Sequence, residues 1–322
     1  MGPGIELPAA LGTNVPPTNN TDMKTYGWEL QIGWRDQIGD FKYGAKLSLS
    51  DSQSKILRYG NPTGSLSKYV EGELIGNIYG YTTIGIAKTD EEMQQHLASL
   101  PNGGQSALGS QWAAGDIMYA DLNGDGKINN GSYTINDMGD MKKIGNSTPR
   151  FMTGINLDAA YKGWDLQMFW QGVLKRDWWP GDKNMTFWGV TDGEWWSTSF
   201  KEHLDYFRTS ENPLGENLNS YYPRPIFNTK NNKSQTRYLQ NAAYMRLKNI
   251  QVGYTFPKVW INKLMLQNLR IFVSGENLLT ITSLSDTMDP ETCGAGYQST
   301  EQANGTVYPL AKTISFGLSV NF

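Results

Sequence analysis

An acidic segment in the first half of the chain has the residue types and spacing of a calcium-binding loop. Oxygen-bearing side chains at alternate positions, a glycine for the sharp turn at Gly126 and a backbone carbonyl make up the first half of an EF-hand loop. Ser132 stands where that loop has its bidentate Glu, so Asp137 or Asp140 would supply the missing carboxylate. A turn that needs no metal is the alternative. The predicted Ca²⁺ ligands are Asp121, Asn123, Asp125, Lys127 through its carbonyl, and Asp137.

A second group of candidate residues is aromatic and follows in one polar stretch. Its members are Trp178, Trp179, Phe187, Trp188, Trp195 and Trp196. Flat aromatic faces beside Asp and Asn stack on sugar rings, and Trp clusters also anchor protein interfaces. We predict substrate contact for Trp178, Trp179 and Trp188. The alternative is that the loop packs its aromatic residues into a core of its own, which we favour for Trp195 and Trp196 because they precede a predicted helix with a Ser199–Glu202 capping box.

The sequence shows no motif of an enzyme. His96 and His203 are the only histidines, and we expect both at ordinary polar positions of short helices, the first of them starting at a Thr89–Glu92 capping box. No nucleophile elbow, phosphate loop or dinucleotide fingerprint occurs. Cys293 is the only cysteine, which excludes an internal disulfide and a cysteine-based zinc site. The net charge of −3, from 28 Lys and Arg against 31 Asp and Glu, argues against a nucleic-acid partner.

Alternation of apolar and polar residues predicts the elements that carry these loops. The first such segment has on one face Tyr26, Trp28, Leu30, Ile32 and Trp34. The same period of two recurs in six further segments, which indicates β-strands. At about 10 residues or more they approach the length of membrane-crossing strands, and aromatic residues near their ends resemble an interfacial girdle. No apolar run of about 18 residues occurs, which excludes a membrane-spanning helix but not a membrane-spanning strand.

The connections between the predicted strands alternate in length. The predicted segments are a lead-in loop (1–23), a hairpin (24–53), a long extracellular loop (54–148), a hairpin (149–176), a Trp-rich extracellular loop (177–237), a hairpin (238–281), a loop (282–306) and a terminal strand (307–322). Short turns on one side and long loops on the other are typical of outer-membrane barrels. Seven antiparallel strands are an odd number and cannot close. The sequence therefore predicts an all-β chain that forms part of a larger transmembrane β-barrel, with short helices in its extracellular loops. A soluble β-rich carbohydrate-binding or structural protein is the alternative.

Several motifs, in order along nearly the whole chain, resemble one family. They are LGTNVP (11–16), GDIMYADLNGDGKI (115–128), IGNSTP (144–149), YKGWDL (161–166), YMRLKNI (244–250) and GYTFP (253–257). The family is that of the SusC/RagA-type TonB-linked outer-membrane transporters of Bacteroidetes. The resemblance implies a barrel of about 22 strands with an N-terminal plug. It also implies TonB-driven import of glycans or peptides, a SusD-like surface lipoprotein as partner and a location in outer-membrane lipid.

The sequence departs from that family pattern at its start. The stretch after Met1 has neither the basic start nor the apolar core of a signal peptide, and no plug or TonB-contacting segment is recognisable. Either the protein is cytoplasmic or the start of the gene is missing. The resemblance favours the second reading, in which this chain is the C-terminal barrel portion and the TonB complex is reached through the missing part.

The last predicted strand ends on an aromatic residue. Its alternating face and terminal position resemble the signal by which outer-membrane barrels are taken up for assembly. The residues of this predicted signal are Gly317, Leu318, Val320 and Phe322. An ordinary amphipathic strand is the alternative reading.

Overall fold

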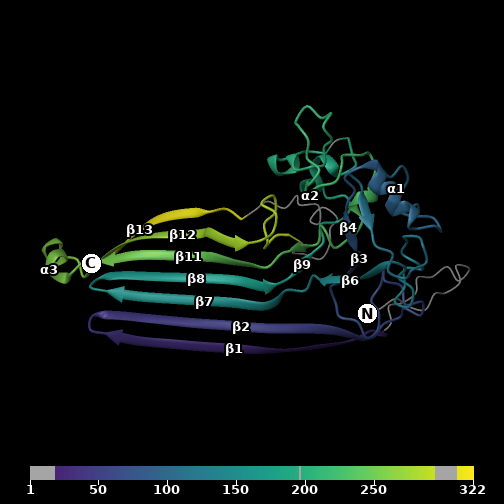
Figure 1. The fold of residues 1–322 in the computed structure, drawn as a ribbon. Coiled ribbons are helices and arrows are strands. Elements are labelled where there is room, and N and C mark those ends of the chain that lie inside the picture. The colour runs from purple at the N-terminus through teal and green to yellow at the C-terminus, as the bar shows by residue number, and fades with distance from the viewer. Residues whose placement is uncertain (1–18, 196, 294–309) are drawn as a thin grey trace, which may run out of the picture.

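The computed structural model describes residues 19–195, 197–293 and 310–322, and its main element is one antiparallel sheet (Figure 1). Seven strands follow one another in the order β1-β2-β7-β8-β11-β12-β13. Their bounds are β1 (Asp22–Ile38), β2 (Phe41–Arg58), β7 (Arg150–Tyr161), β8 (Trp164–Lys175), β11 (Tyr244–Thr255), β12 (Asn268–Thr282) and β13 (Thr313–Asn321). The predictions for residues 1–18, Trp196 and 294–309 lie outside the described residues.

Tight turns join the strands at one end of the sheet. Gly39, with φ +59°, lies in the turn between β1 and β2. Lys162 and Gly163, with φ +45° and +91°, make the two-residue turn between β7 and β8. Positive φ at both central residues is the hairpin geometry that matches the twist of the flanking strands. The third connection at this end contains α3 (Lys258–Ile261) and the 3₁₀ turn η5 (Asn262–Leu264).

The strand register places apolar and polar residues in separate rows across the sheet. Directly paired residues share a face, so a row of partners reports the chemistry of that face. One row, from β2 to β13, is Tyr43, Ala159, Leu166, Val252, Val273 and Phe316. A neighbouring row on the other face, from β1 to β13, is Arg35, Gly44, Asp158, Gln167, Gln251, Ser274 and Ser315. The sheet therefore has one apolar face and one polar face along its whole width.

The long connections fold together at the other end of the sheet into a compact unit, here called the loop domain (residues 77–146, 177–241 and 284–293) (Figure 1). Its strands are β3 (Asn77–Tyr81), β4 (Thr83–Ile86), β5 (Ile117–Tyr119), β6 (Met141–Asn146), β9 (Asp177–Trp178) and β10 (Gln240–Asn241). Its helices are α1 (Asp90–Ala98) and α2 (Met185–Trp188), with the 3₁₀ turns η2 (Gly189–Thr191), η3 (Lys201–Leu204) and η4 (Lys230–Asn232). The loop domain thus carries short helices, as the sequence predicts.

The two predicted loop helices have different outcomes. The N-cap of α1 is Thr89, whose hydroxyl accepts a hydrogen bond from Glu92 N at 3.1 Å, and Met93 is fully buried beneath it. The helix predicted after Ser199 is wrong. Residues there form only η3. Of the three side chains predicted to share one face of that helix, Phe200 and Leu204 are 45% and 53% exposed, and Phe207 is buried. The hydrophobic spacing indicated a helix, but His203 caps a single turn instead.

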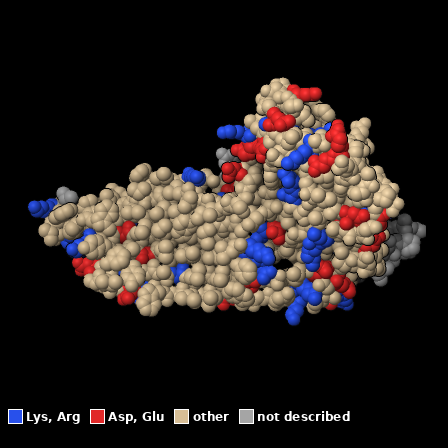
Figure 2. All heavy atoms as spheres, in the orientation of Figure 1, with Lys and Arg blue, Asp and Glu red and all other residues tan. Residues whose placement is uncertain are grey.

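The buried hydrophobic core lies in the loop domain, and large exposed apolar side chains lie on the sheet. Every member of the core cluster comes from the loop domain or its margins, including Tyr119, Phe187, Trp188 and Tyr238. In contrast, the alternating apolar face of β1 is between 44% and 63% exposed from Tyr26 to Trp34. Figure 2 shows few charged side chains over the middle of the sheet and many over the loop domain. The all-β prediction is confirmed, although the described sheet is open and shows no closed barrel. Among the described residues, no helix is both long and apolar enough to cross a membrane.

Gly253 lets an ion pair cross β11 on the polar face of the sheet. Arg270 of β12 donates to both carboxylate oxygens of Asp165 of β8, at 3.0 and 2.5 Å, across the intervening strand. A Cβ at Gly253 would collide with both of these side chains. The pair therefore depends on the absence of a side chain between its two partners.

Gly253→Val is expected to separate Asp165 from Arg270 and to lower stability by about 1 to 3 kcal/mol. The measurement is the thermal unfolding midpoint of the full-length protein in detergent. Gly33→Val is the matched control, because a Cβ at Gly33 meets no atom within 4 Å. Equal midpoints for the two variants would contradict this role for Gly253.

Candidate functional site

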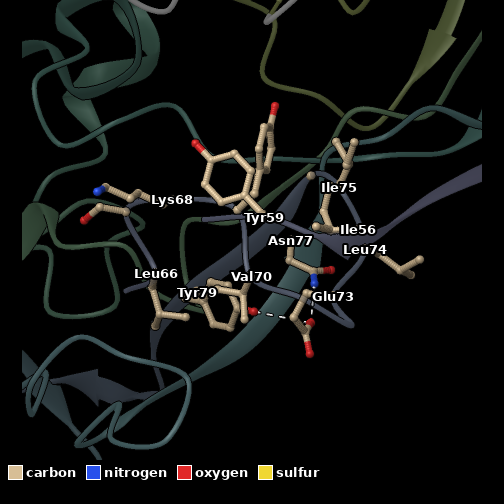
Figure 3. Close-up of a pocket in the computed structure, with 13 residues that line it drawn as sticks. Ile56, Tyr59, Leu66, Lys68, Val70, Glu73, Leu74, Ile75, Asn77 and Tyr79 are labelled. Carbon is tan, nitrogen blue, oxygen red and sulfur yellow. Dashed lines mark hydrogen bonds between the residues drawn. The ribbon is translucent and has the colours of Figure 1, made fainter. Parts of the chain in front are cut away.

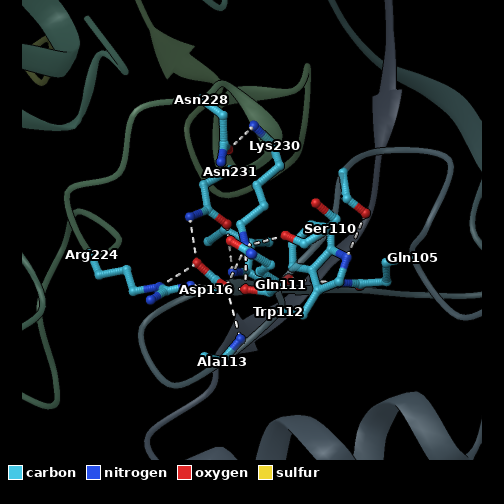
Figure 4. Close-up of polar contacts among 12 residues, drawn as sticks. Gln105, Ser110, Gln111, Trp112, Ala113, Asp116, Arg224, Asn228, Lys230 and Asn231 are labelled. Carbon is cyan, nitrogen blue, oxygen red and sulfur yellow. Dashed lines mark hydrogen bonds and ion pairs between the residues drawn. The ribbon is translucent and has the colours of Figure 1, made fainter. Parts of the chain in front are cut away.

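A buried polar hub ties the two longest connections of the loop domain together (Figure 4). Asp116 is completely buried and precedes β5 in the first of these connections, 54–148. Its carboxylate accepts hydrogen bonds from Arg224 at 2.8 and 2.9 Å and from Asn231 at 2.9 Å, both in the second connection. The ammonium of Lys230 lies 2.8 Å from Asp116 Oδ2. Segments more than 100 residues apart are therefore joined at one carboxylate.

The hub is fully paired, which gives it a structural role. Burial alone would raise the pKa of Asp116, but hydrogen bonds from Arg224, Lys230 and Asn231 outweigh it and lower that pKa. Lys230 Nζ also donates to two backbone carbonyls at 2.9 Å and lies 4.5 Å from the centre of the Trp112 ring. Sequence reasoning missed this hub. Its only signal was that Asp116 falls within the GDIMYADLNGDGKI motif.

The predicted substrate-contacting tryptophans lie mainly inside the loop domain. Trp188 has no exposed surface, and Trp178 is 5% exposed. Trp188 packs edge-on against Phe187 and Tyr238, with ring centroids 4.9 and 4.8 Å apart. The self-packed alternative therefore describes Trp188 in this structure. Trp179 is half-buried at the edge of the core and keeps a surface for contact, so substrate contact there stays a prediction.

Trp195 and His203 also differ from their expected environments. Trp195, expected in the core, is 78% exposed. His203, expected at a polar helix position, is only 1% exposed. Both ring nitrogens have partners inside the loop domain: Nδ1 accepts a hydrogen bond from Phe200 N at 2.8 Å, and Nε2 lies 3.1 Å from Phe187 O. A neutral ring with its proton on Nε2 satisfies both contacts. Burial lowers the pKa of His203, in keeping with a structural neutral imidazole.

The acidic loop adopts a tight turn that its own side chains hold together. Asp121 accepts from Gly124 N at 2.6 Å and from Gly126 N at 2.9 Å. Asn123 Oδ1 accepts from Asp125 N, and Asp125 Oδ1 accepts from Lys127 N. These contacts are those of an Asx-rich turn, which is the metal-free alternative, and they also pre-form the loop shape that a Ca²⁺ site uses.

The predicted fifth ligand, Asp137, lies in a turn of its own. Its carboxylate accepts from the backbone and hydroxyl of Ser132 at 2.8 and 2.6 Å. The carboxylate that meets the acidic loop is Asp140, which is buried and accepts from Leu122 N and Asn129 N on either side of it. Among the described residues, no cluster of three or more Asp, Glu, His or Cys side chains is arranged to hold a metal. Calcium binding by the remaining predicted ligands stays a prediction.

A cavity of about 350 Å³ lies where β2 leaves the sheet (Figure 3). Tyr59 and Tyr79 line it together with apolar side chains such as Leu66. Glu73 accepts from Asn77 at 2.6 Å and from the Tyr79 hydroxyl at 3.4 Å, and it pairs with Lys143 at 2.7 Å. Aromatic faces beside a fixed carboxylate suit a polar organic ligand.

The residues of the predicted assembly signal lie on an edge strand of the described sheet. Gly317, Leu318 and Val320 are in β13, where Leu318 is 65% exposed and pairs with Ile271 of β12. Phe322 follows the strand and is 85% exposed. Their role in assembly stays a prediction.

Comparison with curated proteins gives two relatives along the whole chain. TonB-dependent receptor P3 of Formosa agariphila is 27% identical over 98% of this chain and 30% of its own length. The chain is related to TonB-dependent receptors. TonB-dependent receptor P39 of the same organism is 23% identical over 99% of this chain and 32% of its own length. The chain thus spans about a third of these relatives, whose names are those of receptors rather than enzymes. No family model matches the sequence.

Solved structures share the fold at lower sequence identity. The RagAB peptide transporter has a TM-score of 0.63 and 17% identity, over 99% of this chain and 31% of its own. The RagAB peptide importer in its closed-closed state has a TM-score of 0.61 and 18% identity, over 98% of this chain and 31% of its own. The resemblance of this sequence to TonB-dependent receptors is confirmed by the two relatives, and the RagAB structures share its fold.

If the acidic loop binds calcium, Asp121→Ala combined with Asp125→Ala will abolish calcium-dependent stabilisation of the full-length protein. Thermal unfolding with 1 mM Ca²⁺ and with a chelator measures this, since a ligand that binds only the folded state raises the midpoint; the millimolar level is about the weak end of protein Ca²⁺ sites. Asp137→Ala is the control, and its calcium response should equal that of the parent. A calcium response that survives the double substitution would contradict the site.

Proposed function

We propose that this chain forms a section of the wall of a TonB-dependent outer-membrane importer, with the apolar face of the sheet in lipid. The observation that carries the proposal is where the apolar residues lie. The loop domain buries its apolar side chains in a core, as a water-soluble domain does, whereas the sheet exposes its rows of apolar side chains. Water would penalise an exposed apolar face of seven long strands, whereas a bilayer solvates it. The relation to TonB-dependent receptors and the RagAB-like fold support the same function.

The proposal orients the sheet in the membrane. The loop domain lies on the extracellular side and the tight turns lie in the periplasm, which is the arrangement of outer-membrane barrels. The polar face, which carries the Arg35–Asp158 and Asp165–Arg270 ion pairs, then faces the water-filled interior. Strands from the rest of the receptor continue the sheet at β1 and β13 and close it into a barrel.

The proposed cargo is an oligomeric nutrient, a glycan or a peptide. The sequence resemblance supports a SusD-like surface lipoprotein as the partner, with energy from the TonB complex through other parts of the receptor. Exposed apolar side chains of the loop domain, such as Trp195 and Phe227 at 78% and 83% exposure, suit contact with such a partner.

The orientation predicts which positions a membrane-impermeant maleimide reaches in intact cells. Leu214→Cys, at a 63% exposed site in the loop domain, should be labelled before lysis, and Asp40→Cys in the β1–β2 turn only after lysis. The full-length receptor is used with its other accessible cysteines replaced; Cys293 is buried and serves as the unlabelled control. Labelling of Asp40→Cys in intact cells would contradict the orientation.

The import function predicts that deletion of the gene abolishes growth on at least one polymeric carbon or nitrogen source. Deletion of TonB in the same host should abolish growth on that source as well, because the proposed uptake depends on TonB. Growth on the corresponding monomer, which passes through general porins, is the control. Unchanged growth on every polysaccharide and peptide tested would contradict import by this protein.

A further inference from the structure

Two lysines extend the apolar face of the sheet at the end that meets the loop domain. Lys24 of β1 and Lys55 of β2 are direct cross-strand partners, and both are exposed. Each lies two residues beyond the row in which Tyr26 pairs with Gln53. Residues two apart on a strand share a face, so both lysine side chains leave the sheet on the side of Tyr26 and Trp28. This is the side that faces lipid in the proposed importer.

The opposite face of the two strands is occupied at the same level. The hydroxyls of Thr25 and Ser54, which neighbour the two lysines along the chain, lie 2.8 Å apart in a hydrogen bond. Ile56 is 2% exposed, and its backbone hydrogen-bonds to Gly72 and Glu73 of the segment that follows β2. The chain itself therefore covers the interior side here, and the two lysines lie on the other side.

The charge of the two lysines is not balanced within the described part of the chain. No acidic side chain there forms an ion pair with either lysine. The two carboxylates nearest on this hairpin are engaged elsewhere. Asp22 Oδ2 lies 2.9 Å from Arg58 Nε, and Asp51 forms an ion pair with Arg150. Like charges directly opposite each other on a sheet destabilise it, so an anion between the two ammonium groups would be stabilising.

The length of the strands places the two lysines at a definite depth in the proposed importer. Gln53 lies ten residues along β2 from Tyr43, which stacks on Phe41 near the tight turns. At about 3.4 Å per residue and a tilt of about 40°, this stretch rises about 26 Å, close to the height of the apolar band of a barrel. The two lysines lie about 5 Å beyond that band, at the depth of lipid headgroups. Tyr26 and Trp28, each 46% exposed, then form the aromatic belt next to them.

We propose that Lys24 and Lys55 together bind the phosphate of a lipid headgroup in the outer leaflet of the membrane. The inference rests on the proposed function, because it names a lipid partner for the membrane-facing side of the importer. Ammonium groups donate charge-assisted hydrogen bonds to phosphate oxygens, and lysine side chains extend along apolar surface to reach the headgroups. One phosphate between the two ammonium groups replaces a repulsion by two attractions. The bound lipid fixes the depth of the β1–β2 hairpin in the membrane.

The test measures lipid binding by the full-length receptor purified in detergent. The probe is lipid A, and lipid A from which the phosphates have been removed is the control ligand. Native mass spectrometry gives the Kd for the parent and for three double variants. Lys24→Gln with Lys55→Gln removes both charges, and Lys24→Arg with Lys55→Arg keeps them. Lys42→Gln with Lys46→Gln is the matched control, because these exposed lysines of β2 lie on the polar face of the sheet.

The expected result is a Kd for lipid A about 20-fold weaker in the variant with Lys24→Gln and Lys55→Gln, since each basic side chain near an anionic headgroup contributes about a factor of five in affinity. Lipid A without phosphates should bind the parent about as weakly. The arginine variant and the matched control should bind lipid A like the parent. Without lipid, all variants should keep the parent's unfolding midpoint within a few degrees.

Four results would each overturn the proposal. They are no binding of lipid A, an unchanged Kd in the glutamine variant, equal affinity for the two forms of lipid A, and displacement of lipid A by millimolar inorganic phosphate, as at a site for the free ion. Maleimide labelling in intact cells and TonB-dependent growth would be unaffected by these outcomes, which separates them from a failure of the proposed function.

Discussion

The pairing of backbone hydrogen-bonding groups within one continuous antiparallel sheet is the constraint on which the rest of the structure depends. In lipid no water is available to backbone amides, so strands cross a membrane only as part of a closed sheet. The seven strands satisfy this need between their neighbours over most of their length. Among the described strands, β1 and β13 are each paired on one side only. Their free edges are therefore the places where the proposed importer must add strands.

The same constraint separates the molecule into two regions with opposite distributions of apolar residues. In the proposed importer, residues in the sheet alternate between lipid and a polar interior and need no buried core. The long connections form the buried core that the sheet lacks. This core contains an aromatic cluster around Trp188 and Tyr238, and the buried carboxylate of Asp116 joins two of the connections. Loops of this length would be costly to order without such a core. With it, they present a fixed surface above the sheet.

The sequence predicted the sheet well because period-two alternation is a local signal. The hairpin at 149–176 and the helix start at Thr89 are likewise local signals, since each depends on a few adjacent residues. The packing inside the loop domain could not be predicted from the sequence. Trp188 is buried and Trp195 exposed, opposite to expectation, because burial there is decided by contacts with distant segments. Asp137 or Asp140 was expected to complete the acidic loop; Asp137 accepts from Ser132 instead, and the buried carboxylate beside the loop is Asp140. The hub at Asp116 arises only when separate loops meet.

In the proposed importer the apolar face of the sheet lies in lipid, and a nitroxide scan along β11 measures this most directly. Single spin labels would be placed in turn at Asn249, Ile250, Gln251 and Val252 of the full-length receptor in bilayers. Accessibility should have a period of two: high to lipid-soluble oxygen at Ile250 and Val252, and high to a water-soluble nickel reagent at Asn249 and Gln251. High accessibility to the nickel reagent at all four positions would contradict it.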